Sequence, residues 1–292
     1  MFIVKNKLIF IGLAVLLVLA SLFSVYRFGI KKGIDFTGGT VVELTFVQTV
    51  PTIVGADFEK EGVKAYPLPN GAYKFISQKS YEETRVVIDT FVKKASYPYT
   101  ETQVTTVGPS LGKEMTKKAS IAITVVVLAI LGFIAFAFRE VSRPVASWKY
   151  GVAAMVTIVH DIIIPTGVYA YLSHMYGAEI DTLFVVALLT VMAVTISDKI
   201  VVFDRIRENL KVMKGEFEEI IGASLKQTMV RSVNTSLTTV LSLIALYFFG
   251  PESTKFFSLT LLVGLIVGTY SSIFVASPLL TYLQTEGKKG KK

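Results

Sequence analysis

The sequence predicts a polytopic α-helical membrane protein with six transmembrane helices and one α+β, ferredoxin-like extracytoplasmic domain between helices 1 and 2. The 292 residues are 52% hydrophobic and only 18% charged, whereas an average soluble domain carries about 25% charged residues. Six apolar runs of roughly the length that a bilayer requires follow one another along the chain. A long polar stretch with mixed strand and helix patterns separates the first run from the second.

Residues 1–26 are predicted to be a cytoplasmic N-terminus and transmembrane helix 1. Lys5 and Lys7 precede an apolar run from Leu8 to Tyr26. A cleaved signal peptide is the alternative, but its apolar region is usually only about 7–15 residues long and ends at a small-x-small cleavage site. This run is longer and lacks such a site, so we expect a retained helix.

Residues 27–118 are predicted to form the extracytoplasmic domain. Alternating apolar residues indicate strands, and apolar residues at helical spacing indicate helices. The expected strands are 41–47, 63–68, 72–76 and 101–107, and the expected helices are 52–62 and 80–95. The order strand, helix, strand, strand, helix, strand is that of a ferredoxin-like split βαβ unit.

Residues 119–283 are predicted to hold transmembrane helices 2–6, and residues 284–292 a basic cytoplasmic tail. The expected spans are 120–138, 151–172, 182–203, 233–249 and 256–283. Lysine and arginine are concentrated in the leader, in the second and fourth connections between spans, and in the tail, which is typical of cytoplasmic segments. Both termini are therefore predicted to be cytoplasmic and the large loop extracytoplasmic.

Several classes of function are disfavoured by composition. The chain has no cysteine and only two histidines, His160 and His174, so we expect no metal site and no cofactor. It has neither a Gly-x-x-x-x-Gly-Lys-Ser/Thr phosphate loop nor a nucleophile–base arrangement, and we expect no enzyme. The net charge of +8 lies largely beside apolar runs, which favours membrane lipid and not nucleic acid as the basic residues' partner.

Ionisable residues inside predicted spans mark candidate functional sites, because a charge in hydrocarbon is costly. The fourth span contains Asp198 and Lys199 near its predicted end at residue 203, with Thr195 on the face of Asp198. Lys199 is expected either to reach toward the interface or to compete for Asp198. In the third span Thr157, His160 and Asp161 fall at i, i+3 and i+4 on one helix face. They are expected to form a packing contact or to include a proton-responsive pair, His160 and Asp161.

The fifth span supplies a possible counter-ion for Asp198. A polar stripe at helical spacing consists of Arg231, Asn234, Thr235, Thr238 and Ser242. Arg231 is expected at the same depth as Asp198 on a neighbouring helix, so the two should pair, either as a proton-coupling pair or as a purely structural one. The candidate proton pathway comprises His160, Asp161, Thr195, Asn234, Thr235 and Thr238.

Three runs carry a resemblance to a known family. They are Gly-Ile-Asp-Phe-Thr-Gly-Gly-Thr at 33–40, Val-Gly-Pro-Ser-Leu-Gly at 107–112, and Val-Val-Phe-Asp-Arg-Ile-Arg-Glu-Asn at 201–209. Together with the six-span layout they resemble the SecF family, whose members are subunits of the bacterial SecDF protein-translocation accessory complex in the resistance-nodulation-division superfamily. The motif residues are Gly33, Asp35, Phe36, Gly38, Gly39, Asp204 and Arg205.

The resemblance implies a function in protein export. It implies SecD as partner, action with the SecYEG translocon on unfolded preprotein, and location in the plasma (inner) membrane of a bacterium, with the proton motive force driving export. The family's membrane acid and arginine fall on Asp198 and Arg231. The sequence departs from the family pattern at 197–199, where Ser-Asp-Lys stands in place of the usual Asn-Asp-Thr. The alternatives are a scaffold subunit that conducts no protons and a proton-driven exporter of small molecules.

Overall fold

The computed structural model describes residues 2–46, 55–68, 71–94, 98–138 and 146–289, and the chain divides into two compact units. The helical unit contains residues 1–29, 123–171 and 183–292, and the sheet unit contains residues 30–122 and 172–182. The second segment of the sheet unit was not predicted, because it is the short connection between the third and fourth spans.

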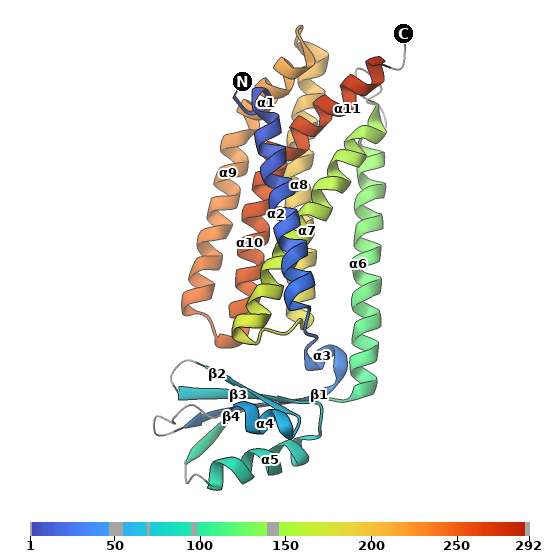
Figure 1. Cartoon of the computed structure of the whole chain (residues 1–292). Helices are drawn as coiled ribbons and strands as arrows, with labels where there is room; N and C mark the ends of the chain where they lie inside the picture. The colour runs from blue at the N-terminus through green and yellow to red at the C-terminus, as the bar shows by residue number, and fades with distance from the viewer. Residues whose placement is uncertain (1, 47–54, 69–70, 95–97, 139–145, 290–292) are drawn as a thin grey trace. The chain divides into compact units, whose positions relative to one another are not determined.

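Within the described residues, six helices are long and apolar enough to cross a membrane, as predicted (Figure 1). A short helix α1 (Phe2–Lys5) precedes the first of them. The first five long helices are α2 (Lys7–Phe28), α6 (Pro109–Ala137), α7 (Ser147–Tyr176), α8 (Thr182–Val212) and α9 (Phe217–Phe249). The last span begins with α10 (Lys255–Ser271) and continues through the π-helical turn η3 (Ser272–Ala276) into α11 (Ser277–Lys289).

Two of these helices extend well beyond their apolar runs. α8 continues to Val212, and α9 begins at Phe217 rather than near residue 233. The predicted end of the fourth helix at residue 203 is therefore wrong. Hydrophobicity marks where a helix crosses lipid, whereas backbone hydrogen bonding continues through amphipathic ends. Residue 203 therefore ends the apolar run but not the helix.

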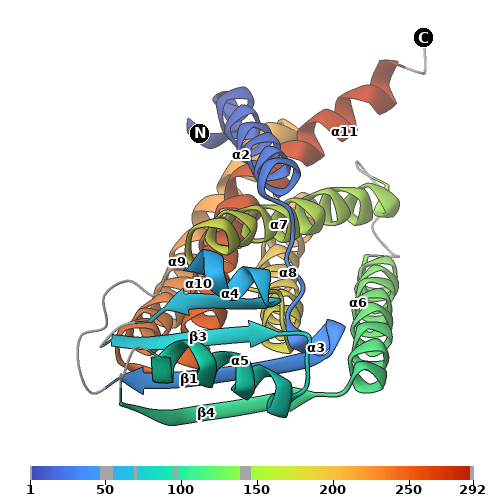
Figure 2. The same cartoon turned by 60° about the horizontal axis from the view of Figure 1, so that its bottom comes forward.

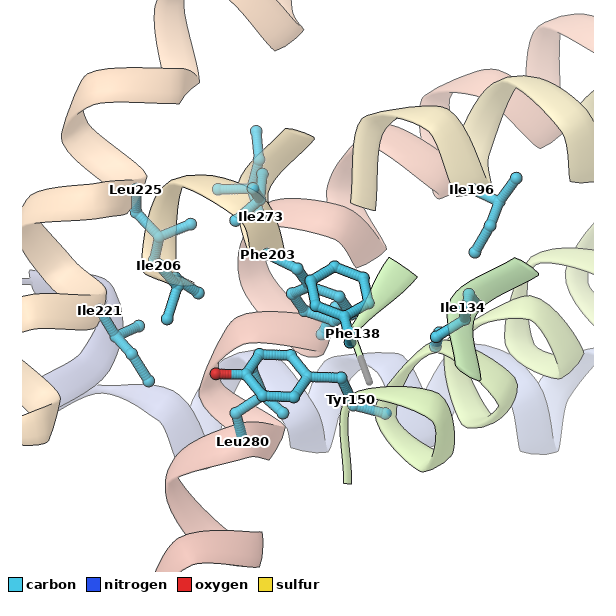
Figure 3. Close-up of a cluster of buried hydrophobic side chains, with 14 of the residues drawn as sticks. Ile134, Phe138, Tyr150, Ile196, Phe203, Ile206, Ile221, Leu225, Ile273 and Leu280 are labelled. Carbon is cyan, nitrogen blue, oxygen red and sulfur yellow. The ribbon is translucent and has the colours of Figure 1, made fainter. Parts of the chain in front are cut away.

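The core of the helical unit lies where α6, α7, α8, α9 and the last span meet (Figure 3). The rings of Phe138 and Tyr150 stack with centroids 5.1 Å apart, and Phe203 packs edge-on against Tyr150 at 5.5 Å. Burial is uneven among the spans. About half of the most apolar part of α7, α8 and the last span is buried, against 11% for α2, 6% for α6 and 11% for α9.

Small residues allow α10 to approach α8 closely. Gly264 and Gly268 are one turn apart on α10, and an added Cβ would lie 2.3 Å from Val191 Cγ2 at the first position and 2.0 Å from Thr195 Cγ2 at the second. Closely approaching backbones held by such small-xxx-small pairs are typical of helix contacts in membranes.

The sheet unit has the predicted order of elements (Figure 2). Its strands are β1 (Gly39–Phe46), β2 (Val63–Pro67), β3 (Ala72–Ser77) and β4 (Tyr99–Val107), and all three neighbouring pairs in the order β2-β3-β1-β4 are antiparallel. Its helices are α3 (Ile34–Thr37), α4 (Gly55–Lys60) and α5 (Tyr81–Lys94). The first part of the helix expected at 52–62 falls outside the described residues.

The sheet packs against α4 and α5 through one apolar face. Val42, Leu44 and Phe46 alternate along β1 and are buried, as the period of two for strand side chains requires. They share a cluster with Phe58 of α4 and Ile88 of α5.

Candidate functional site

A buried ion pair joins two membrane helices of the helical unit. Lys199 Nζ of α8 donates to Asp161 Oδ2 of α7 at 2.6 Å, and both side chains are 0% exposed. Removing two charges from water is costly, and the pair is maintained only when the geometry is close and further hydrogen bonds satisfy the remaining polar atoms. Lys199 also lies 3.4 Å from the carbonyl oxygen of Thr195, one turn earlier on α8.

The second carboxylate oxygen of Asp161 contacts His160. The Nδ1 atom of His160 lies 3.0 Å from Asp161 Oδ1, and the hydroxyl of Ser271 on α10 lies beside the same carboxylate. Gly268 lies against the Asp161 carboxylate, since a Cβ added at this glycine would be 3.6 Å from Asp161 Oδ2. In the described part of the chain, His160 Nε2 and the Thr195 hydroxyl are buried without a protein partner. Such atoms are costly unless water or a rearranged side chain satisfies them.

The cluster confirms that His160 and Asp161 contact each other and corrects the expectation for Lys199. Lys199 neither reaches toward the interface nor pairs with Asp198. Successive residues of a helix point about 100° apart, so Lys199 faces α7 while Asp198 is only half buried on the adjoining face. Two opposite charges in separate apolar spans were the signal that could have revealed this partner.

Asp198 has a different environment. The Ser236 hydroxyl of α9 lies beside its carboxylate, and Ser236 Oγ also accepts a hydrogen bond from Thr269 of α10 at 2.6 Å. Among the described residues, no ion pair joins Asp198 to Arg231. The charge of Arg231 nevertheless acts on the Asp198 carboxylate, so the pairing of these two residues stays a prediction.

Arg231 is exposed and lines a small polar pocket of about 170 Å³ between α8 and α9. Asp204, Arg205 and Glu208 line it from α8. The run at 201–209 thus forms the α8 wall of the pocket that holds Arg231. Asn209 of the same run also joins α8 to α9, since its Nδ2 donates to Ser224 Oγ at 2.8 Å and to Gln227 Oε1 at 3.0 Å.

The predicted polar pathway divides into two groups. His160, Asp161 and Thr195 come together in the buried cluster. Asn234, Thr235 and Thr238 are exposed along α9 and do not join it, and the two threonine hydroxyls donate back to their own helix at 2.9 Å. The exposed stripe, which we define as Arg231, Asn234, Thr235 and Thr238, lies within a membrane-spanning helix.

The other two motif runs meet in the sheet unit. Gly38 has a φ of +78°, and a Cβ there would lie 2.8 Å from Pro109 Cα; Gly39 has a φ of +138°, and a Cβ there would lie 2.3 Å from the carbonyl oxygen of Ser77. Gly112 is constrained by close approach alone, with 2.8 Å between its hypothetical Cβ and the Gly38 nitrogen. Both conformation and close approach therefore favour glycine at positions 38 and 39.

Asp35, between Gly33 and Phe36 of the same run, caps the first residue of α8. Its Oδ2 accepts a hydrogen bond from the backbone N–H of Thr182 at 2.9 Å. Gly33 donates to the Ile180 carbonyl oxygen at 2.8 Å, and Ile180 donates to Lys31 at 2.8 Å. The run at 33–40 is thus tied to the residues that precede α8. The described residues hold no group of three or more metal-ligating side chains.

Comparison with known proteins decides the family. A family model for the protein export membrane protein SecD/SecF, C-terminal, matches residues 87–286, and one for the SecD/SecF GG motif matches residues 23–50. The protein translocase subunit SecF of Thermobaculum terrenum is 40% identical over 295 residues, covering 95% of this chain and 92% of the relative. The chain belongs to the SecF family. The SecF of Anaerolinea thermophila is 33% identical over 95% of this chain.

Solved SecDF structures share the fold. The crystal structure of SecDF from Thermus thermophilus, a translocon-associated membrane protein, superposes with a TM-score of 0.83 at 32% identity and covers 97% of this chain. A SecDF in a super-membrane-facing form gives a TM-score of 0.68 at 31% identity. This chain spans 38% of the first SecDF chain and 39% of the second.

Membership of the SecF family makes this chain a bacterial membrane protein with six apolar spans and an accessory subunit of the protein translocase. The glycines of its GG motif occupy the constrained positions 38 and 39.

Proposed function

We propose that this chain couples the proton motive force to preprotein export, as the partner of SecD beside the SecYEG translocon in the plasma membrane. The observation that carries the proposal is the contrast between its two membrane acids. Asp161 has Lys199 as a counter-ion at 2.6 Å, whereas Asp198 has no ion pair among the described residues. A carboxyl group without a counter-ion can gain and lose a proton more readily than one held by an ammonium group.

The exposed stripe on α9 supports a partner. An arginine and three further polar side chains facing hydrocarbon would be costly, and such groups normally face protein or a water-filled path. This chain has somewhat over a third of the length of a solved SecDF chain. In our proposal a SecD half covers the exposed stripe.

Arg231 is the group that would respond to Asp198. It lines the pocket with Asp204 and Glu208, and Asp198 lies on the same pair of helices beside Ser236. We propose that Arg231 faces the α8 pocket while Asp198 is protonated and approaches Asp198 after the proton leaves. Helix movement would follow because a charged acid and an arginine attract each other strongly away from water.

The charge distribution supports the orientation in this proposal. The leader and tail lysines, together with the basic residues at the end of α8, favour an orientation with both termini in the cytoplasm and the sheet unit outside. The same lysines would contact lipid headgroups.

The test is Asp198→Asn in proteoliposomes that contain this chain, SecD and SecYEG. We expect the complex to co-purify normally, while stimulation of preprotein transport by the proton motive force falls to the level seen with an ionophore. The matched control is Glu216→Gln, which changes an exposed acid before α9 in the same way and should retain stimulation. Full stimulation in Asp198→Asn would contradict proton coupling through this residue.

A scaffold function is the second candidate, and the exposed stripe is the observation that favours it. If the stripe serves only assembly, Arg231→Ala should abolish co-purification with SecD. In that case Asp198→Asn would lose activity only to the extent that it loses SecD. The ratio of activity to bound SecD separates the two functions.

A further inference from the structure

An apolar groove of about 880 Å³ opens on the helical unit between α1, α2, α9 and η3. Phe10 of α2 and Phe274 of η3 form one wall, with ring centroids 4.7 Å apart. Leu225, Met229 and Val230 of α9 contribute to the other. Pockets of about 300–1,000 Å³ with mostly apolar walls and a few polar groups are typical of ligand sites.

The groove has one charged residue among the described residues that line it. Lys226 lies on α9 one turn before Val230 and one turn after Gly222, so apolar or small residues flank it on its own helix face. It is exposed and forms no ion pair within the described part of the chain. The acids near the start of α9 do not neutralise it, since Glu218 is bound by Lys7 at 2.5 Å and Glu219 lies two turns away.

The short helix α1 lines the groove and is anchored in the helical unit. Val4 is 3% exposed in the core of the helical unit, while Phe2 and Ile3 line the groove. The Asn6 side chain donates to the Phe2 carbonyl oxygen at 3.0 Å, which terminates α1 before α2 begins. The groove is therefore formed by anchored elements on spans α2 and α9, of which only 11% is buried within the chain.

We propose that this groove binds an anionic phospholipid, with an acyl chain along Phe10, Phe274 and Met229 and the phosphate at Lys226. An apolar surface on a membrane-spanning helix meets hydrocarbon, and a lysine one or two turns outside extends its ammonium group toward headgroups. Basic pockets between transmembrane helices are known sites for acidic headgroups. A partner helix in the same place would have to bury Lys226 against an acid. This proposal does not depend on proton coupling.

The probe is quenching of a single tryptophan by brominated lipids in the assembled complex with SecD. Trp148, the only tryptophan of the chain, is changed to phenylalanine, SecD is used without tryptophan, and Phe10→Trp places the reporter in the groove. Quenching is compared between brominated phosphatidylglycerol and brominated phosphatidylcholine. We expect phosphatidylglycerol to be preferred by about fivefold, the effect of one lysine near an acidic headgroup.

The preference should fall to about one in Lys226→Gln, because the lysine supplies the selectivity. Lys214→Gln is the matched control, since it removes the same charge from an exposed position outside the groove and should leave the preference unchanged. Equal quenching by both lipids in the Phe10→Trp protein that retains Lys226 overturns the proposal. Absence of quenching by either lipid would overturn it too, since the groove would then be occupied by protein.

Discussion

At the scale of single residues, the pairing of charges decides which acid is free. Lys199 forms its ion pair with Asp161 of α7, where both side chains are fully buried, although its charge also acts on the neighbouring Asp198. The half-buried Asp198 instead lies beside Ser236.

Single and double substitutions at the buried pair should therefore be strongly non-additive. Lys199→Met leaves Asp161 buried without a counter-ion and should lower the free energy of unfolding by about 3–5 kcal/mol. Asp161→Asn combined with Lys199→Met removes both charges and should recover most of that loss. The measurement is unfolding of the full chain in mixed detergent micelles, followed by circular dichroism. Additive losses would show that the two side chains are not coupled.

At the scale of elements, close contact between α8 and α10 depends on two glycines. The space at Gly268 is filled by Thr195 of α8, next to the Asp161 carboxylate. The contact between α8 and α10 therefore positions α10, the third helix of the buried cluster beside α7 and α8. Any side chain at position 268 must push α10 away from α8, because a separation of 2.0 Å from Thr195 Cγ2 is far below van der Waals contact.

Gly268→Ala should destabilise the helical unit by about 1–3 kcal/mol, the usual range for overpacking. Gly132→Ala in α6 is the control, since nothing lies within 4 Å of the Cβ that it adds. In that position alanine should be neutral or slightly stabilising, because it is the better helix former. Unfolding midpoints of the two variants in the same detergent give the comparison. Equal midpoints would mean that α8 and α10 are not in close contact at residue 268.

At the scale of the whole molecule, segments distant in sequence combine into one unit. The connection at 172–182 belongs to the sheet unit with residues 30–122. Asp35 of the motif run accepts the hydrogen bond from Thr182, the first residue of the helix that carries Asp198 and Lys199. The motif therefore has a structural task at the beginning of α8.

Asp35→Ala should loosen that connection. Loss of a helix-capping acceptor costs about 1 kcal/mol, which corresponds to roughly fivefold faster amide hydrogen exchange at 180–183 if those amides open locally. Hydrogen exchange with mass spectrometry on the full chain measures this directly. Glu61→Ala, an exposed acid of the same unit, should leave exchange at 180–183 unchanged. Unchanged exchange in Asp35→Ala would show that the cap contributes nothing to this junction.

The sequence alone determined the spans, the order of strands and helices in the sheet unit, and the residues of the family runs. These features depend on hydrophobicity and on local periodicity, which are properties of neighbouring residues. It also grouped His160 and Asp161 with Thr157, because residues three and four apart lie on one helix face whatever surrounds them.

Only the tertiary structure decided which charge meets which. The helix ends lie beyond the apolar runs, so those runs alone do not show where α8 ends or where α9 begins. The rotation of α8 turns Lys199 to Asp161 and directs Asp198 toward α9. Helix rotation is set by packing, here by the glycines of α10 against Val191 and Thr195. A sequence pattern defines the face of a helix but not the neighbour toward which packing turns it.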